Sequence, residues 1–162
     1  MTIYTIIPSP IGHLLLAGDG HTLEALHMQD GPRPTRLKPE WARDDDAFAP
    51  VRAQLDEYFT GARRRFDLIL NPHGNPFELN VWGALQQIPY GETASYGELA
   101  SRIGHPDAAR AVGSANARNP IAVIVPCHRV IGADGSLTGY GGGLERKRLL
   151  LELEAGVLAL PL

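Results

Sequence analysis

The residues best suited to chemistry lie together in one short segment, Pro126-Cys127-His128-Arg129, which follows an apolar stretch. Cys127 is the only cysteine, so the chain can form neither an intramolecular disulfide nor a multi-cysteine zinc site. A thiolate is a strong nucleophile, and nearby cations lower the pKa of a thiol. We therefore predict that Cys127 is a nucleophile activated by His128 and Arg129. The competing interpretation is a cysteine buried as a small core residue.

A nucleophilic cysteine needs a base, and the base needs a group that orients it. His128 is the histidine next to the thiol, and we predict that it acts as the base. It would act through a water molecule, because adjacent side chains of an extended segment point apart. A carboxylate at Glu145, Glu152 or Glu154 of the C-terminal helix is the candidate orienting group, and spacing alone does not choose among them. Asn119 is either a turn residue or, if buried, an amide that holds the loop.

The elements that must position this segment begin with a region rich in short strands. Its apolar runs are β-branched or leucine-rich and are bounded by turn residues, whereas one amphipathic run has helical spacing and ends at Gly61. The expected elements are strands at 2–7, 13–17, 21–28 and 66–70, a surface loop at 31–45, a helix over 48–59, and a solvated loop at Arg63-Arg64-Arg65.

The sequence NPHGNP at 71–76 breaks secondary structure and predicts a domain boundary, with an α/β scaffold over 1–74 and a second domain over 75–162. The second domain is mainly helical. Its expected elements are a helix from Pro76 that includes Ile88, a helix begun by a Ser95–Glu98 capping box, a helix from Pro106 to Ala117, a buried strand at 121–125, a flexible glycine-rich turn at 132–143, and a C-terminal helix with a solvated first turn at 145–148. The fold class is therefore α+β, with a helix-turn-helix.

The helix expected over 106–117 consists almost entirely of small residues around one long side chain, Arg110. It is either a helix that packs closely against a neighbour or a slim helix that enters a groove of DNA. Major-groove readers usually project several polar side chains, which this helix lacks. Binding by this helix would therefore be weakly base-specific and in the minor groove.

Composition limits the possible modes of action. The chain has 162 residues, 44% of them hydrophobic, and a formal net charge of −3, which suits one globular domain or two small ones and excludes polybasic DNA binding. The N-terminal stretch lacks the basic region of a signal peptide, and no apolar run could span a bilayer. A single thiol suits a reducing compartment, so we expect a cytoplasmic protein without a membrane partner.

From Pro126 to Val130 the sequence resembles the O6-alkylguanine-DNA alkyltransferases, also called methylated-DNA–protein-cysteine methyltransferases. The similarity includes IPYGETASYGELA at 88–100, ARAVG at 109–113, Asn119-Pro120, and the GYGGG…LLLELE tail, and it covers about residues 77–155. The resemblance implies DNA repair by one irreversible transfer of an alkyl group from O6-alkylguanine, and possibly O4-alkylthymine, to Cys127. It implies no cofactor, and a monomer that binds duplex DNA carrying a flipped alkylated base.

The resemblance also implies roles for individual residues. His128 would act as the base through a water, Glu154 would orient it, and Asn119 would hold the loop. Tyr96 would contact the flipped nucleotide and its phosphate, and Arg110 would fill the gap left in the stack. The base pocket would be formed by Val130 and Tyr140, with the amide of Gly141 at the base oxygen, and Ala109 and Ser114 would lie at the DNA. Relatives that bind zinc use cysteines that the N-terminal half lacks, so no metal is expected.

Three alternatives remain open. The first is a protein that binds alkylated bases without chemistry, which the presence of Cys127, His128 and Glu154 disfavours. The second is a cysteine hydrolase with turnover, for which no oxyanion-hole motif is present. The third is a helix-turn-helix module with a merely structural cysteine, whose function would survive blocking of the thiol.

Overall fold

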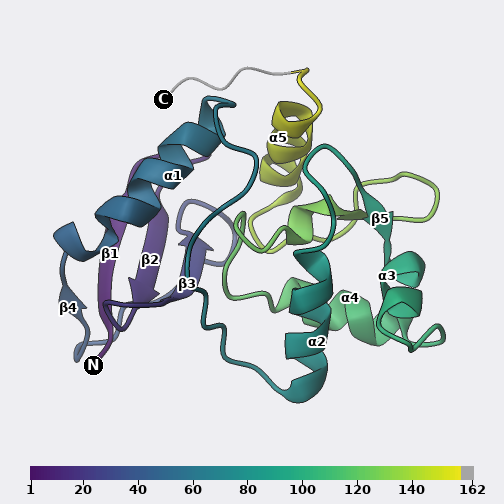
Figure 1. The fold of residues 1–162 in the computed structure, drawn as a ribbon, viewed down its shortest axis with the longest axis horizontal. Helices are drawn as coiled ribbons and strands as arrows, with labels where there is room; N and C mark the ends of the chain where they lie inside the picture. Colours follow the sequence, from purple (N-terminus) through teal and green to yellow (C-terminus); the bar gives the residue numbers. More distant parts are fainter. Residues whose placement is uncertain (158–162) are drawn as a thin grey trace.

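A four-stranded sheet and the helix that covers it make up the first half of the chain in this computed structural model, which describes residues 1–157 (Figure 1). Three of the four strands match the sequence predictions, and they pair as an antiparallel meander. The strands lie in the order β3-β2-β1-β4, with β1 at Ile3–Ile7, β2 at Leu14–Gly18, β3 at Leu23–Met28 and β4 at Ala42–Arg43.

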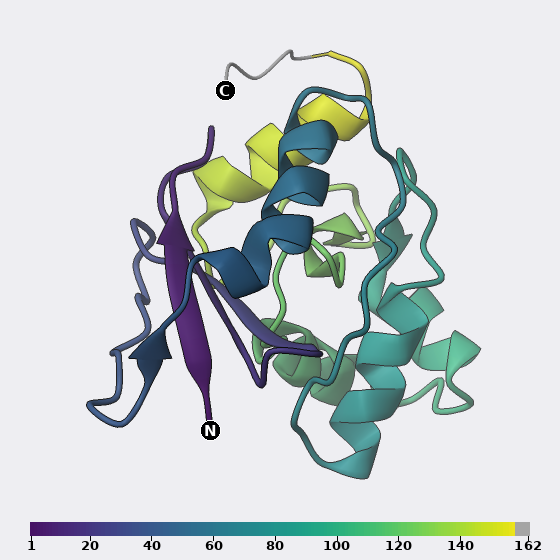
Figure 2. The ribbon, with the colours of Figure 1, turned by 60° about the vertical axis from the view of Figure 1, so that its left-hand side comes forward.

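Helix α1, Ala49–Phe59, confirms the expected amphipathic helix and follows a 3₁₀ turn at Asp46–Phe48. Its apolar side presents Val51, Leu55 and Phe59 to the core. Turning the molecule by 60° shows α1 close to the C-terminal helix α5, Leu144–Glu154, as well as over the sheet (Figure 2). This position brings the end of α1 close to the second half of the chain.

Two predictions for the first half were wrong. Residues 66–70 form no strand, since only Leu70 makes an isolated bridge, to Leu23, while Phe66 and Leu68 pack against the core from a loop. Their alternating pattern reflects one-sided burial rather than sheet pairing. In contrast, β4 lies inside the proline-rich segment that was expected to be all loop, where it pairs in parallel with β1.

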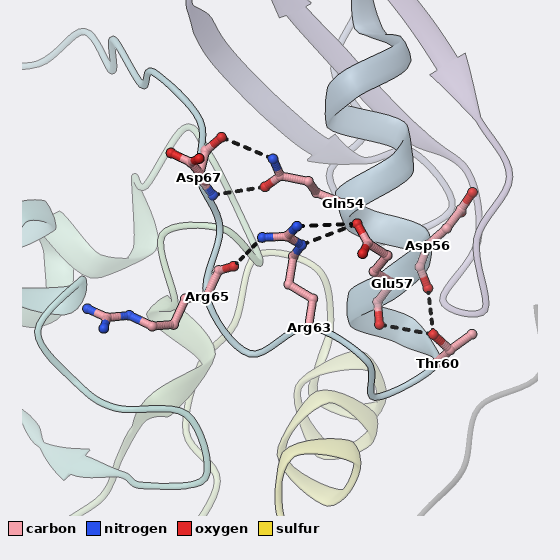
Figure 3. Close-up of polar contacts among 7 residues, drawn as sticks. All are labelled: Gln54, Asp56, Glu57, Thr60, Arg63, Arg65 and Asp67. Atoms are coloured by element: carbon pink, nitrogen blue, oxygen red, sulfur yellow. Dashed lines mark hydrogen bonds and ion pairs between the residues drawn. The ribbon is translucent and has the colours of Figure 1, made fainter.

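The arginine triplet lies on the connection between α1 and this loop, and only part of it is free in solvent. Arg63 binds Glu57 at 3.3 Å and donates to the carbonyl of Arg65 at 2.9 Å, while the Gln54 side chain bonds the backbone of Asp67 (Figure 3). The side chain of Arg65 points away from these contacts. The segment is therefore a connection held by the hydrogen bonds of Arg63, whereas Arg64 and Arg65 are exposed as the expected solvated loop requires.

The second half is mainly helical and confirms the α+β class with a helix-turn-helix. Asn75 and Ser95 each begin a helix with a complete capping box, and Trp82 of α2 donates to the carbonyl of Ala115 in α4 at 2.8 Å. The elements are α2 at Pro76–Leu85, β5 at Ala94–Ser95, α3 at Tyr96–Arg102, α4 at Ala109–Ala117, β6 at Val130–Ile131 and α5 at Leu144–Glu154. Within residues 1–157, no helix has the length and apolarity needed to cross a bilayer.

Helix boundaries differ from the predictions in two places. Helix α4 begins at Ala109 rather than Pro106, and no side chain caps its N-terminus. Helix α2 ends at Leu85, and Ile88 is buried just beyond it. Between α3 and α4 the chain turns at Gly104, whose φ of 80° suits glycine.

Candidate active site

The segment that leads to Cys127 is a buried, tightly turned loop, and the prediction of a strand at 121–125 was wrong. Val123 has a φ of 69°, and the amide of Val125 bonds back to the carbonyl of Ile121 at 3.0 Å. Cys127 then begins a 3₁₀ turn, Cys127–Arg129. Burial explains the apolar, β-branched sequence, because residues 121–125 contribute to the core without joining a ladder.

Two sets of hydrogen bonds hold this loop in place. The Asn119 amide donates to the carbonyl of Val125 at 2.8 Å and accepts from the amide of Ile121 at 3.0 Å. On the other side, Leu26 of β3 exchanges backbone bonds with the loop, 2.8 Å to the carbonyl of Pro120 and 3.1 Å from the amide of Ala122. The loop is therefore bonded to β3, which is an edge strand of the N-terminal sheet.

Cys127 lies on the wall of a cavity of about 310 Å³ between β3, the end of α4 and the glycine-rich loop. The residue is only 5% exposed. Several predicted site residues meet here, but Val130 does not, because it is fully buried in β6. The lining residues are Leu26, His27, Met28, Arg33, Asn116, Ala117, Arg118, Asn119, Ala122, Cys127, Gly139, Tyr140, Gly141 and Gly142.

Burial raises the pKa of the Cys127 thiol, contrary to the expectation of a lowered value. The nearby polar side chains of Asn119 and Tyr140 and the charge of Lys147 act in the opposite direction without outweighing burial. The positive charge of Arg129 is directed elsewhere, at Glu154. A thiol in this state needs a base to become a nucleophile at neutral pH.

Glu154 is the carboxylate that the structure places at His128. Its Oε2 accepts from His128 Nε2 at 2.8 Å, and Arg129 binds both oxygens at 2.8 and 3.0 Å. Burial raises the pKa of Glu154, but these two partners outweigh that effect and lower it to about 2. The two alternative carboxylates, Glu145 and Glu152, instead pair with Arg148 on the surface.

The imidazole of His128 is fully buried, and burial lowers its pKa, so the ring is neutral at pH 7. Because Nε2 faces the ionised Glu154, it carries the ring proton, and Nδ1 is the unprotonated atom. Within residues 1–157, Nδ1 has no hydrogen-bond partner. The geometry therefore leaves a free basic nitrogen next to Cys127 in the chain.

Tyr58, at the end of α1, reaches the same carboxylate. It was missed in the sequence predictions, because the first half was treated as a scaffold. Its hydroxyl donates to Glu154 Oε2 at 2.6 Å across the interface between the halves. The helical pattern does place Tyr58 on the buried side of α1, and a buried tyrosine hydroxyl usually has a partner. The pattern does not indicate which partner.

Lys147 was also missed, because the start of α5 was expected to be solvated. It is fully buried and donates to the carbonyls of Val130 at 2.5 Å and Thr138 at 2.9 Å, one just before the glycine-rich loop and one within it. Burial lowers the pKa of Lys147, and its charge in turn favours the Cys127 thiolate. Lys147 therefore both ties the loop and supports ionisation of the thiol.

Replacing Lys147 by methionine is expected to cost about 1–3 kcal/mol of stability, because two buried carbonyls lose their donor. The pKa of Cys127 should rise further at the same time. Denaturant unfolding measures the first effect, and the pH dependence of thiol labelling measures the second. An unchanged labelling profile would show that Lys147 acts on the loop alone, and Lys38→Met, on the surface, is the control.

Comparison with known proteins matches both halves of the chain to one family. Residues 2–72 match the ribonuclease-like domain of 6-O-methylguanine DNA methyltransferase, and residues 76–156 match its DNA binding domain. The chain belongs to this methyltransferase family. The domain boundary at residue 74 stays a prediction.

Individual relatives agree over nearly the whole chain. A methylated-DNA–protein-cysteine methyltransferase of Methanosarcina acetivorans is 51% identical over 93% of this chain and 97% of its own length. The enzyme of that name from Mycobacterium tuberculosis strain H37Rv is 56% identical over 95% and 93%. A crystal structure of Mycobacterium tuberculosis OGT in complex with DNA superposes with a TM-score of 0.90, at 54% identity over 96% and 94% of the two chains.

The remaining residues that the methyltransferase resemblance singled out lie on or near α4. Arg110 and Ser114 are exposed, and Ala109 is half-buried. Tyr96, at the start of α3, packs close to Gly113 of α4 and its hydroxyl pairs with that of Thr138 at 2.8 Å. Gly141 is exposed on the loop that borders the cavity. In the described part of the chain, no three His, Cys, Asp or Glu side chains gather as a metal site would require.

Close packing explains why position 142, in the glycine-rich loop of this methyltransferase, is a glycine. A Cβ on Gly142 would lie 2.2 Å from Met28 Sδ and 3.0 Å from the Tyr140 ring, both on the cavity wall. We expect Gly142→Ala to cost about 1–3 kcal/mol by overpacking. The matched control is Gly139→Ala on the same loop, where an added Cβ meets nothing within 4 Å. Equal unfolding midpoints for the two variants would contradict this account.

Proposed function

We propose that this protein repairs duplex DNA by moving the alkyl group of O6-alkylguanine to the sulfur of Cys127, once per molecule. The observation that carries the proposal is the position of the only thiol, on the wall of a cavity large enough for one base, in a chain of this methyltransferase family. Relatives named for this activity and a relative's structure with DNA support it. O4-alkylthymine is a second candidate substrate.

The chemistry follows from the arrangement of the residues. The thiol gives its proton through a water to Nδ1 of His128, and Glu154 stabilises the imidazolium that forms. The sulfur then attacks the alkyl carbon, an S–C bond forms, and the C–O bond breaks with its electron pair on the guanine oxygen. The Tyr140 hydroxyl, buried on the cavity wall with no hydrogen-bond partner among residues 1–157, can donate a hydrogen bond to the departing ring. The guanine anion takes up a proton from water, and the imidazolium returns its proton to solvent, so no cofactor is needed. Asn119 keeps the loop in position.

Access of the base requires that it leave the stack, at a cost of a few kcal/mol. We assign α4 to the minor groove, because its exposed side is made of small residues such as Ala111 and Ser114 around Arg110. Arg110 would occupy the gap in the stack, and Tyr96 would contact the flipped nucleotide and its phosphate. The protein would act in the cytoplasm as a monomer, since the proposed chemistry needs no second chain.

The test is incubation with duplex DNA carrying one O6-methylguanine, followed by mass mapping of the peptide that contains Cys127. We expect a gain of one methyl group on Cys127, one event per chain, and restored guanine in the DNA. Turnover beyond one event per chain would indicate a hydrolase-like mechanism. Tight binding of the duplex with an unmodified thiol would indicate a lesion-binding protein.

A further inference from the structure

Arg146, in the first turn of α5, has no part in the mechanism above, although it connects three distant parts of the chain. Its Nε donates to the carbonyl of Ile11 at 2.8 Å, and its Nη2 donates to the carbonyl of Asp30 at 3.1 Å. Its Nη1 makes a longer bond, 3.4 Å, to the carbonyl of Gly142. All three guanidinium nitrogens therefore join α5 to two turns of the N-terminal sheet and to the glycine-rich loop.

The sheet side of this connection is itself held in place. The backbone amide of His13 donates to Asp30 Oδ2 at 2.9 Å, and the ring Nδ1 of His13 contacts the same oxygen at 2.9 Å. The amide of Gln29 in turn donates to the carbonyl of His13 at 2.9 Å. Arg146 thus binds a turn at the end of β3 whose position is fixed by several other hydrogen bonds.

The two segments that Arg146 joins are also two walls of the cavity that contains Cys127. Residues 26–28 of β3 form one wall, and residues 139–142 of the glycine-rich loop form another. Just after β3 their backbones come close together, since a Cβ on Gly31 would lie 3.0 Å from the carbonyl oxygen of Gly142. The bonds of Arg146 therefore set how far apart these two walls stand.

The spacing of the walls limits what the cavity can accept. A pocket distinguishes alkyl groups by the space that its walls leave for them. A bulky substituent on the guanine oxygen needs more space than a methyl group. If the glycine-rich loop moves away from β3 to provide that space, it must give up its bond to Arg146. The cost of breaking this bond falls on large substituents and not on small ones.

We propose that Arg146 holds the glycine-rich loop close to β3 and so limits the size of the alkyl group that this protein can transfer. This inference rests on the proposed function and deepens it, since it assigns the substrate range of the same cavity. Arg146 is a positioning residue, because it acts through the loop and not through contact with the substrate.

The test compares single-turnover transfer rates from duplexes that carry either O6-methylguanine or O6-benzylguanine. In Arg146→Met, which removes all three donors, we expect the ratio of the benzyl rate to the methyl rate to rise about fivefold, the equivalent of one net hydrogen bond. Arg146→Lys, which keeps part of the hydrogen bonding, should give a smaller rise. Arg148→Met is the matched control on the same helix and should keep the ratio of the unaltered protein, because Arg148 pairs only with Glu145 and Glu152.

A second variant acts on the same spacing while Arg146 stays in place. Gly31 does not have a positive φ, so its backbone accepts alanine. The added Cβ would press on the Gly142 carbonyl from the β3 side, and the loop must yield by a few tenths of an ångström. We expect Gly31→Ala to raise the ratio of benzyl to methyl transfer as well. Gly83→Ala on α2, where an added Cβ meets nothing within 4 Å, is its control.

The ratio separates a limit on size from general damage to the loop. An unchanged or lower ratio in Arg146→Met would overturn the proposal, because a merely loosened loop slows both transfers alike. If Arg146→Met does not fold, an unchanged ratio in Gly31→Ala would overturn it in the same way. Absence of methyl transfer by the unaltered protein would instead refute the proposed function, so the two failures are distinguishable.

Discussion

Replacing His128 by glutamine is expected to slow alkyl transfer to Cys127 by about 10²–10⁴-fold, the usual contribution of a general base. Glutamine can still donate a hydrogen bond to Glu154, but it has no nitrogen that takes up a proton at neutral pH. Because burial raises the pKa of the thiol, little thiolate would form without the imidazole. The loss should therefore appear in the transfer rate rather than in DNA affinity.

Single-turnover rates and DNA affinity, measured on the same variant, separate these effects. The rate of His128→Gln should recover in part as the pH rises, since hydroxide can then ionise the thiol directly. His21→Gln, at an exposed turn before β3, is the matched control and should react like the parent. A rate within threefold of the parent for His128→Gln would remove His128 from the mechanism.

Replacing Arg129 by methionine is expected to destabilise the fold by about 3–5 kcal/mol, because a buried carboxylate loses its cationic partner. Arg129 is 7% exposed and binds both oxygens of Glu154 and the carbonyl of Ile88. Arg148→Met is the matched control, since Arg148 pairs with Glu145 and Glu152 on the surface. Denaturant unfolding at pH 7 should show little change for that variant.

The pH dependence gives a second measure of the same interaction. The folded state lowers the pKa of Glu154 to about 2, so its pairing contributes fully above the unfolded value near 4.5. This contribution is lost as the pH falls from about 4.5 to about 2. The stability difference between the parent and Arg129→Met should therefore narrow over that range. A difference that stays constant down to pH 2 would show that Arg129 stabilises the fold by packing alone.

Local signals predicted much of the fold. The capping box at Ser95, the helix start at Pro76 and the three leucine- or β-branched strands depend on neighbouring residues, and the structure confirms them as elements. The stretches at 66–70 and 121–125 were misread because buried loops and strands select the same apolar residues. A strand differs from a buried loop in its backbone pairing with a distant segment, and the local sequence pattern does not show that pairing.

The candidate site also combines residues that local sequence could predict with residues that only long-range contacts reveal. Cys127 and His128 are neighbours in sequence, so their proximity could be predicted, whereas the choice of Glu154 over Glu152 needed the helix to be docked. The roles of Tyr58 and Lys147 depend on contacts over 96 and 17 residues, respectively. The predicted effect on the thiol was wrong because burial dominates its pKa, and burial is a property of the folded chain.

The backbone pairing between β3 and the loop before Cys127 also protects the protein from self-association. Strand β3 is an edge of the four-stranded sheet, and open edges invite pairing with other chains. Leu26 is covered by Pro120 and Ala122, and Leu23 is covered by residues 69–71. The backbone bonds that hold the loop before Cys127 therefore also cover the open edge of the sheet. A variant that releases this loop should aggregate more readily and should also transfer the alkyl group more slowly.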